Sequence, residues 1–311
     1  MDNFPLFSEI GGETTRVLRN PESDAAWSAF NPSIGYSESD GYLCTFRSSN
    51  YWYGKNLDKL EILSGNTVQN KTYVSRLGSD LSILDLQEVE YRGFDFSLPR
   101  GPEDAKLYYR NKRWELSAII KEDHAVAVPR VATFYLDGSV ANLIKLWPSP
   151  NSGATEKNWM APYGEAKFDF IYGPNKVYDG NIVTIVNKKR SRLTQNLRGG
   201  SNLYPLHDGT YLGICHTTRK KEATIYDPMS FGSRRVMLRD YTHSFVRCAP
   251  NGAIIQASEE FQFFGPGIEF AAGLVVVDGE VHVSFGYKDL SSYFGIIDLE
   301  KVMEALIDCY L

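Results

Sequence analysis

Cysteine and histidine are scarce in this chain of 311 residues, which has four cysteines and five histidines. None of them has the paired spacing of zinc ligands, so we expect neither a structural nor a catalytic metal site. The scattered cysteines are Cys44, Cys215, Cys248 and Cys309. Isolated thiols of this kind are typical of buried cysteines in a reducing compartment, which predicts a cytoplasmic protein.

Long hydrophobic runs and phosphate-binding loop motifs are also missing from the sequence. No segment approaches the ~18 apolar residues of a membrane helix, and residues 1–5 do not resemble the start of a signal peptide. Neither the Gly-x-x-x-x-Gly-Lys loop nor the Gly-x-Gly-x-x-Gly fingerprint occurs, so a nucleotide would have to bind by another route. The net charge of -5 gives the whole protein no field that would attract nucleic acid or an anionic membrane.

Helical patterns are rare, and the clearest one predicts a short helix at residues 298–306. Elsewhere short alternating apolar stretches are broken by turn dipeptides, as at residues 41–46, 180–186 and 280–285. Aromatic residues make up 13% of the chain, which favours β structure and stacking against sugar rings. The sequence therefore predicts an antiparallel all-β protein.

The turns recur together with compact polar or glycine-containing motifs that precede them. The turn dipeptides are Asp40-Gly41, Asn111-Lys112, Tyr163-Gly164, Asp208-Gly209 and Asp278-Gly279. The upstream motifs are Asn31-Pro32-Ser33, Gly101-Pro102-Glu103-Asp104, Glu156-Lys157-Asn158-Trp159, Arg198-Gly199-Gly200-Ser201 and Gly267-Ile268-Glu269-Phe270. A unit of motif, strand, turn and strand thus occurs five times, at spacings of roughly 40 to 75 residues.

Repetition of small antiparallel sheets around an axis is the arrangement of a β-propeller. We predict a single five-bladed propeller over residues 1–311, with blades at roughly 25–90, 95–150, 155–195, 198–262 and 265–300. Because the innermost strand of each blade lines the central channel, the five motifs would converge there. An irregular β-sandwich with accidental turn spacing is the alternative.

At these motifs the sequence resembles glycoside hydrolase family 130, the β-mannoside phosphorylases and hydrolases, and related mannosyltransferases. The segment Gly101-Pro102-Glu103-Asp104-Ala105-Lys106 resembles that family's Gly-x-Glu-Asp-Pro-Arg signature, whose aspartate is the catalytic acid. The resemblance implies that Asp104 is catalytic and that Glu103 and Lys106 lie near the substrate. Ala105-Lys106 stands in place of the signature's Pro-Arg, a departure that weakens the transfer of substrate contacts.

The other motifs carry the resemblance into the remaining blades. Asn31 and Ser33, with Arg47, resemble the first-blade motif that grips the sugar, and Lys157-Asn158-Trp159 resembles a divergent branch. Arg198 with the following glycines, and His216 on the next strand, resemble the fourth-blade segment. Asp289 resembles a fifth-blade aspartate that binds sugar hydroxyls, a role that we also assign to Glu269.

Each of these residues has a structural alternative. Asp104 could be a turn carboxylate that caps backbone amides, and Glu103 is expected to point to the opposite side of the strand and hold a loop. Trp159, Tyr163 and residues 51–53 could stack on sugar rings or pack between blades. The basic stretch 188–192 is expected as a solvated loop, with guidance of a polyanionic acceptor, including nucleic acid, as the alternative.

Cations from different blades predict a phosphate pocket near the channel mouth. The candidates are Arg47, Lys157, His216 and Arg219. Guanidinium and ammonium groups suit a phosphate, either free or within a sugar phosphate or nucleotide sugar. Surface salt bridges, and a core histidine in the case of His216, are the structural alternatives.

These features together predict an inverting glycosyl-transfer enzyme of the glycosyltransferase or glycoside phosphorylase type. It would move a hexose, with mannose the first to test, between a phosphate-containing donor and a hydroxyl acceptor. We expect phosphate, a sugar phosphate or a nucleotide sugar as co-substrate, and no further cofactor. A hydrolase of the same fold and a non-catalytic carbohydrate- or partner-binding propeller are the alternatives.

Overall fold

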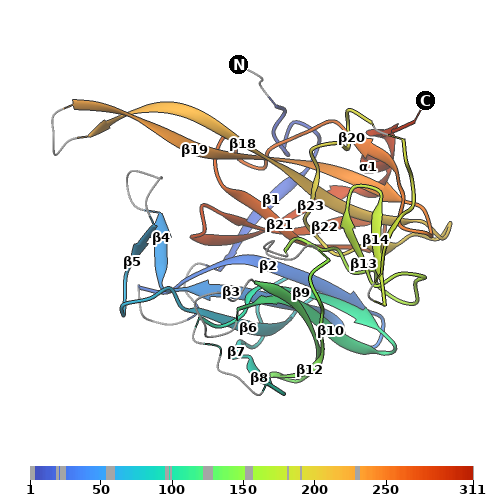
Figure 1. Ribbon diagram of the computed structural model, residues 1–311, viewed down its shortest axis with the longest axis horizontal. Coiled ribbons are helices and arrows are strands. Elements are labelled where there is room, and N and C mark those ends of the chain that lie inside the picture. The colour runs from blue at the N-terminus through green and yellow to red at the C-terminus, as the bar shows by residue number, and fades with distance from the viewer. Residues whose placement is uncertain are drawn as a thin grey trace.

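A computed structural model describes residues 4–18, 21, 26–53, 60–94, 98, 100–121, 129–150, 157–180, 182–189, 191–227 and 232–310, without the side chains of 53, 221–227 and 232–237. Five sheets, the blades, are arranged around a common axis. Within each blade the strands follow one another from the axis outward (Figure 1). The predicted all-β, five-bladed propeller is confirmed.

The first two blades come from the N-terminal half of the chain. Blade 1 comprises β2 (Ser28–Ser37), β3 (Gly41–Ser49), β6 (Asn70–Leu77) and β7 (Gln87–Glu88). The connection between β3 and β6 carries a small hairpin of β4 (Tyr51–Tyr53) and β5 (Leu60–Ile62). Blade 2 comprises β9 (Glu103–Arg110), β10 (Arg113–Ile120), β11 (Arg130–Asp137) and β12 (Val140–Leu146), with β8 (Glu90–Arg92) parallel to β12 at its edge.

The remaining blades follow in chain order. Blade 3 comprises β13 (Phe170–Gly173), β14 (Lys176–Asp179) and β15 (Ile182–Ile185), with Met160 bridged to Ile171 on its inner side. Blade 4 comprises β16 (Arg198–Gly199), β18 (Tyr211–Asp227), β19 (Gly232–Cys248), β20 (Ile254–Ser258) and β24 (Leu306–Asp308), with β17 (Tyr204–Pro205) beside β18. Blade 5 comprises β21 (Glu269–Val277), β22 (Glu280–Tyr287), β23 (Ser291–Asp298) and β1 (Glu13–Leu18).

Segments near both ends of the chain complete two of the blades. Strand β1 pairs with β23 as the outermost strand of blade 5, and β24 pairs with β20 in blade 4. The ring is thereby closed by hydrogen bonds between residues far apart in sequence. The predicted helix is present as α1 (Leu299–Glu304), where the Asp298 carboxylate accepts from the amides of Glu300 and Lys301. It ends earlier than expected because the chain then enters β24.

Aromatic side chains fill the spaces between the blades. Trp159 packs edge-on against Phe170 and Tyr172, and Trp147 does so against Phe170 and Tyr178. These contacts belong to one hydrophobic cluster that draws residues from blades 1, 2, 3 and 5. Burial of so many large rings, each worth about 1.5–3 kcal/mol in transfer free energy, stabilises the ring of blades.

The described residues can be compared with the expectations about cysteines, membrane spans and metal ligands. All four cysteines are buried and free. Within the described ranges no helix could cross a bilayer, and no three His, Cys, Asp or Glu side chains are grouped as metal ligands.

Strands β18 and β19 continue past the blade as a long two-stranded arm that projects from the body of the propeller (Figure 1).

Candidate functional site

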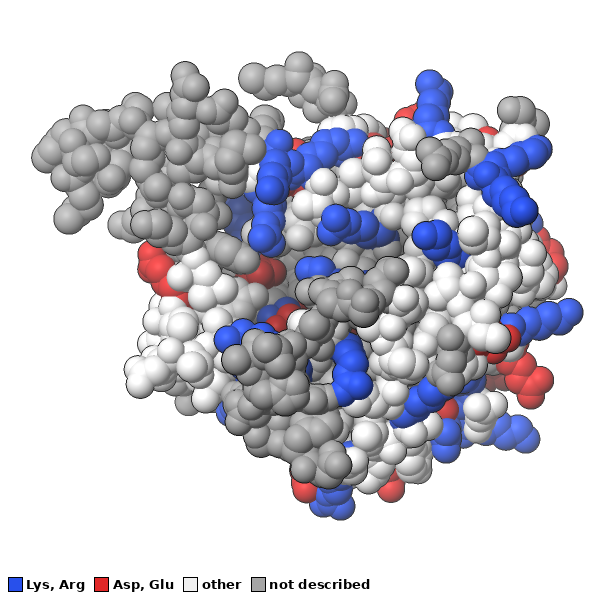
Figure 2. Space-filling model, viewed as in Figure 1, with Lys and Arg blue, Asp and Glu red and all other residues white. Residues whose placement is uncertain are grey.

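A polar cavity of about 300 Å³ lies where the inner strands of the five blades meet. Figure 2 shows Lys and Arg residues around the middle of the face drawn there, with some Asp and Glu atoms visible between them. The lining residues are Asn31, Arg47, Tyr51, Leu60, Val68, Arg100, Glu103, Asp104, Lys157, Asn158, His216, Arg239, Tyr241, Ile268, Phe270 and Asp289. Four of the five predicted motifs therefore converge here, whereas none of the residues 198–201 of the fourth motif lines the cavity.

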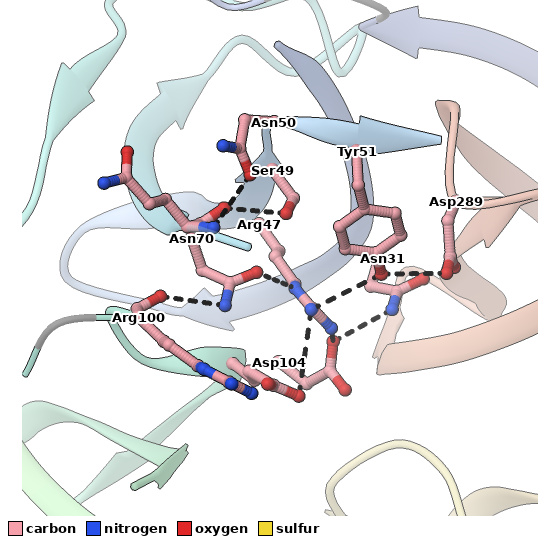
Figure 3. Close-up of polar contacts among 11 residues, drawn as sticks. Asn31, Arg47, Ser49, Asn50, Tyr51, Asn70, Arg100, Asp104 and Asp289 are labelled. Carbon is pink, nitrogen blue, oxygen red and sulfur yellow. Dashed lines mark hydrogen bonds and ion pairs between the residues drawn. The ribbon is translucent and has the colours of Figure 1, made fainter. Parts of the chain in front are cut away.

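Asp104 lies at the centre of the polar contacts in this cavity (Figure 3). Its Oδ1 accepts a hydrogen bond from Nδ2 of Asn31 at 2.9 Å and pairs with Nη1 of Arg47 at 3.0 Å. Burial alone would raise the pKa of Asp104, but the Arg47 charge and the hydrogen bonds from Asn31 and Arg47 outweigh it and hold the pKa below its usual 3.8. The carboxylate is therefore ionised at neutral pH.

A β-bulge in β9 brings a second carboxylate to the cavity. Glu103 pairs with Ile119 and Lys106 pairs with Ser117, so that Asp104 and the following alanine together oppose one residue of β10. Asp104 has the left-handed φ of 50°, which Asp and Asn tolerate better than most side chains. The bulge breaks the alternation of the strand, and Glu103 lines the cavity with its Oε2 3.7 Å from Nη2 of Arg47. The expectation that Glu103 points to the opposite side of the strand is wrong.

The same local conformation recurs on the inner edges of blades 1 and 3. Asn31 has a φ of 48° beside a register shift in β2, and Asn158 has a φ of 64°. Blade 5 approaches Asn31 so closely that a Cβ at Gly286 would lie 2.2 Å from the Asn31 Oδ1. Only glycine fits there, and Asn31 is held in place to donate to Asp104.

Arg47 contacts polar and aromatic side chains as well as the Asp104 carboxylate. Its Nε donates to Oδ1 of Asn70 at 2.9 Å, its Nη2 to the hydroxyl of Tyr51 at 3.5 Å, and its guanidinium lies 5.1 Å from the centre of the Phe30 ring. Burial lowers the pKa of Arg47, but the neighbouring Tyr51, Asp104 and other acids raise it more, so the group stays charged. Arg47 is thus a fixed, buried cation beside the Asp104 carboxylate.

Asp289 enters the cavity from the turn between β22 and β23. Its Oδ2 accepts from the Tyr51 hydroxyl at 3.0 Å. The pKa of Asp289 is raised to about 6, mainly by burial, with the charge of Arg47 opposing the rise and the charge of Asp104 adding to it. The two aspartates of one cavity therefore have pKa values displaced in opposite directions.

His216 lines the cavity but does not add a positive charge to it. Its ring is 2% exposed, stacks on Tyr241 at 5.4 Å and meets the edge of Phe270. Burial, with the charges of Arg198, Lys106 and Lys157, lowers the pKa of His216 to about 3. The neutral ring has an Nδ1 without a hydrogen-bond partner among the described residues. The prediction of a cationic His216 is corrected to a neutral, buried ring at the edge of the cavity.

The cations of the cavity differ in part from those predicted. Arg47 and Lys157 line it, but Arg219 lies elsewhere and pairs with Glu260, with Nη1–Oε2 at 2.6 Å. Arg100 and Arg239 complete the set, and the sequence analysis missed both. Arg100 directly precedes the Gly101 motif, which could have indicated it, whereas Arg239 lies mid-strand in β19 with no local signal.

Several other predicted residues are buried outside this cavity. Glu269 is 0% exposed and accepts from the backbone amides of Phe263 and Phe264 at 2.8 Å, so it organises a loop and does not reach the cavity. Burial raises the pKa of Glu269 to about 7. Ser33 donates to the carbonyl of Ala272 at 3.1 Å and accepts from the amide of Leu107 at 2.9 Å, which ties three blades together.

Lys106 and Trp159 have similar internal roles. Lys106 Nζ donates to the carbonyls of Trp159 and Gly200 beneath the cavity, and burial lowers its pKa to about 8. Trp159 is 2% exposed and Tyr163 4%, so both rings pack between blades and cannot stack on a sugar. Among the proposed platforms whose side chains the structure describes, only the Tyr51 ring lines the cavity.

Arg198 and part of the basic stretch lie outside the central cavity. Arg198 lines a neighbouring groove that adjoins the cavity at Lys157 and Asn158. Lys188 and Lys189 of the basic stretch are exposed. Arg190 in the same stretch, and Glu156 of the third motif, lie outside the described residues.

Solved structures of known proteins share this architecture. β-1,2-Mannobiose phosphorylase from Listeria innocua superposes with a TM-score of 0.60 at 11% identity, over 94% of this chain and 99% of that one. The chain has the fold of a mannoside phosphorylase. MPT-4, a mannose phosphorylase from Leishmania mexicana solved with a phosphate ion, gives 0.56 at 14% identity over 95% and 92% of the two chains.

A transferase shares the fold as well. MPT-1, a GDP-Man-dependent mannosyltransferase from Leishmania mexicana, gives a TM-score of 0.51 at 13% identity over 92% and 89% of the two chains. A search of family models and of curated proteins found no match to the sequence. The structural similarity to GH130 mannoside phosphorylases and to a mannosyltransferase is therefore established at the level of the fold.

Proposed function

We propose that this protein is an inverting glycosyl-transfer enzyme of the glycosyltransferase or phosphorylase type. It moves a hexose, mannose in the first instance, between a phosphate-containing donor and a hydroxyl acceptor. The observation that carries the proposal is the ionised Asp104 carboxylate, held by Asn31 and Arg47 in a cavity lined by four cations. The fold shared with mannoside phosphorylases and a mannosyltransferase supports the choice of sugar.

The chemistry is a single displacement with one carboxylate. In the synthetic direction Asp104 takes the proton of the acceptor hydroxyl, whose oxygen bonds to the anomeric carbon as the bond to the donor phosphate breaks. The bonding electrons leave with the phosphate oxygen, and the developing charge is stabilised by Arg and Lys side chains of the cavity. In the reverse direction the proton returns from Asp104 to the bridging oxygen. The lowered pKa of Asp104 keeps the carboxylate in the ionised form, which is the form that can take a proton.

Other residues of the cavity have binding roles in this proposal. Asp289 and Tyr51 form hydrogen bonds with sugar hydroxyls. Of the cations, Arg239 and Lys157 are exposed and have no ion-pair partner among the residues that the structure describes, whereas Arg47 is held by its protein partners.

The experiment is a matrix of donors and acceptors. The protein is incubated with mannose 1-phosphate or GDP-mannose, with mannose or β-1,2-mannobiose as acceptor, and release of phosphate or GDP is measured together with the anomeric configuration of the product by NMR. We expect release only with an acceptor present, and inversion at the anomeric carbon. Release at the same rate without a sugar acceptor would instead identify a hydrolase. Absence of turnover over a broad panel of phosphorylated donors would reject the proposal.

A further inference from the structure

A second cavity of about 370 Å³ lies between blades 3 and 4, directly beside the central one. Lys157 and Asn158 line both spaces and form the boundary between them. A molecule that reaches past these two residues would thus have one end at Asp104 and the other in this groove between the blades, which we call the side groove.

The side groove is positively charged without compensation. Lys157, Lys176 and Arg198 line it, and none of the described Asp or Glu residues does. All three cations are exposed, and within the described part of the chain none of them forms an ion pair. The central cavity differs, since Glu103, Asp104 and Asp289 line it together with its cations. A groove with three unpaired cations favours an anion over a neutral sugar.

The walls of the side groove leave room for such a ligand and are well supported. Gly199 packs against Asn158 so tightly that a Cβ there would lie 1.9 Å from the Asn158 carbonyl oxygen. At Gly173, by contrast, an added Cβ would meet no atom within 4 Å. Tyr172 is half-buried and rests edge-on against Trp159 at 5.5 Å, so it offers a fixed aromatic surface beside the cations.

We infer that the side groove binds a second anionic group, a phosphate or diphosphate, of a substrate whose reacting end lies in the central cavity. This inference rests on the proposed glycosyl transfer, because it assigns the groove to one of the two reactants. The shared chemistry is a phosphate oxyanion held by Lys157, Lys176 and Arg198. Its source is either the diphosphate of a nucleotide-sugar donor or the phosphate of a phosphorylated sugar acceptor.

The test uses variants that change the side groove and leave the central cavity intact. K176E reverses one charge that lines the groove alone, and G173L fills the open space next to it. K188E is the matched control, because Lys188 is an exposed lysine of the same region that lines neither cavity. Dissociation constants for GDP and for mannose 6-phosphate are measured by calorimetry on each variant, and melting temperature confirms that the fold is unchanged.

We expect K176E and G173L to weaken one of the two ligands by roughly 10- to 100-fold, whereas K188E leaves both within about twofold. Loss of GDP binding assigns the groove to a donor diphosphate, and loss of mannose 6-phosphate binding assigns it to an acceptor phosphate. The inference is overturned if the wild type binds neither ligand, if neither groove variant changes an affinity, or if K188E acts as strongly as K176E. Because binding is measured without turnover, a protein that binds in the groove but transfers no sugar rejects the proposed function alone.

Discussion

The side chain of Asn31, from the inner strand of blade 1, donates a 2.9 Å hydrogen bond to Asp104, from the inner strand of blade 2. Both residues have a left-handed backbone, with φ of 48° and 50°. Each therefore leaves the regular course of its strand at the same level of the channel, and the two polar side chains meet across the blade boundary. A backbone deviation repeated from blade to blade thus assembles the site.

The exposed cations of the central cavity are expected to bind phosphate. Arg239→Ala should weaken the binding of inorganic phosphate by about 1.5–3 kcal/mol, because it removes one charge-assisted contact. Its effect on melting temperature should be small, since Arg239 is exposed. Arg47→Ala should weaken the binding of phosphate. It should also lower the stability of the fold, because it leaves the buried Asp104 carboxylate without its main partner. Calorimetry with phosphate and thermal melts of both variants check this, and unchanged phosphate affinity in both would place the anion elsewhere.

The architecture could be predicted because propeller blades repeat local signals. The turn dipeptides and polar motifs recur at each blade. The five polar motifs, the first at Asn31 and the last ending at Phe270, lie on inner strands or on the segments that enter them. The closure by β1 was not foreseen. Its residues, Glu13–Leu18, give no signal of their partner, since strand β23 lies more than 270 residues further along the chain.

The site was harder to predict for reasons of local geometry and burial. Glu269 lies outside the cavity because its strand alternates, so Ile268 and Phe270 face the cavity instead. Glu103 and Asp104 face the same way because a bulge cancels that alternation in β9. The sequence does not reveal which strand contains a bulge, nor that burial would remove the charge of His216. Composition and motif order located the site, but side-chain direction required the structure.

Burial of Glu269 should make the stability of the protein depend on pH. The pKa of this carboxyl is raised from 4.5 to about 7 by burial, so the folded state binds a proton that the unfolded state has lost. The stability that Glu269 contributes is then greatest below about pH 4.5 and falls as pH rises to about 7, by on the order of 3 kcal/mol. Glu269→Gln should remove this fall, as measured by urea unfolding at several pH values. A wild-type slope retained in the variant would assign the titration to another group.

Tyr51 should tune the acid limb of the pH–activity profile. Its hydroxyl donates to Asp289, and this hydrogen bond lowers the pKa of the carboxyl from what burial alone would give. Tyr51→Phe removes the bond, so the pKa of Asp289 should rise above about 6 and the acid limb of kcat/KM should move to higher pH. Asp289→Asn, which has no titration at this position, is the control and should abolish that limb. An unmoved acid limb in Tyr51→Phe would show that Asp289 does not govern it.

Asp104→Asn tests the residue on which the proposed mechanism depends. Asn has the same shape, tolerates the positive φ of this position, and can still hydrogen-bond, but it cannot take the proton of the acceptor. Turnover should fall by roughly 10²–10⁴. Stability should also fall, by about 1–3 kcal/mol, because Arg47 then lies buried without its closest carboxylate. The pKa of Asp104 is lowered, so this contribution is present above pH 3.8 in the wild type and is lost as pH falls below that value.

The decisive comparison sets Asp104→Asn beside Asp289→Asn and Glu269→Gln, with turnover and melting temperature measured on all three. Glu269→Gln should keep its activity per folded molecule, because the side chain contacts backbone amides away from the cavity. Asp289→Asn should raise KM more than it lowers kcat, since it loses a hydroxyl contact and no proton transfer. Asp104→Asn should lower kcat most. If Asp104→Asn retains wild-type kcat while Asp289→Asn is inactive, the proton moves through the Asp289 carboxyl, whose pKa of about 6 would suit an acid, and the roles of the two aspartates must be exchanged.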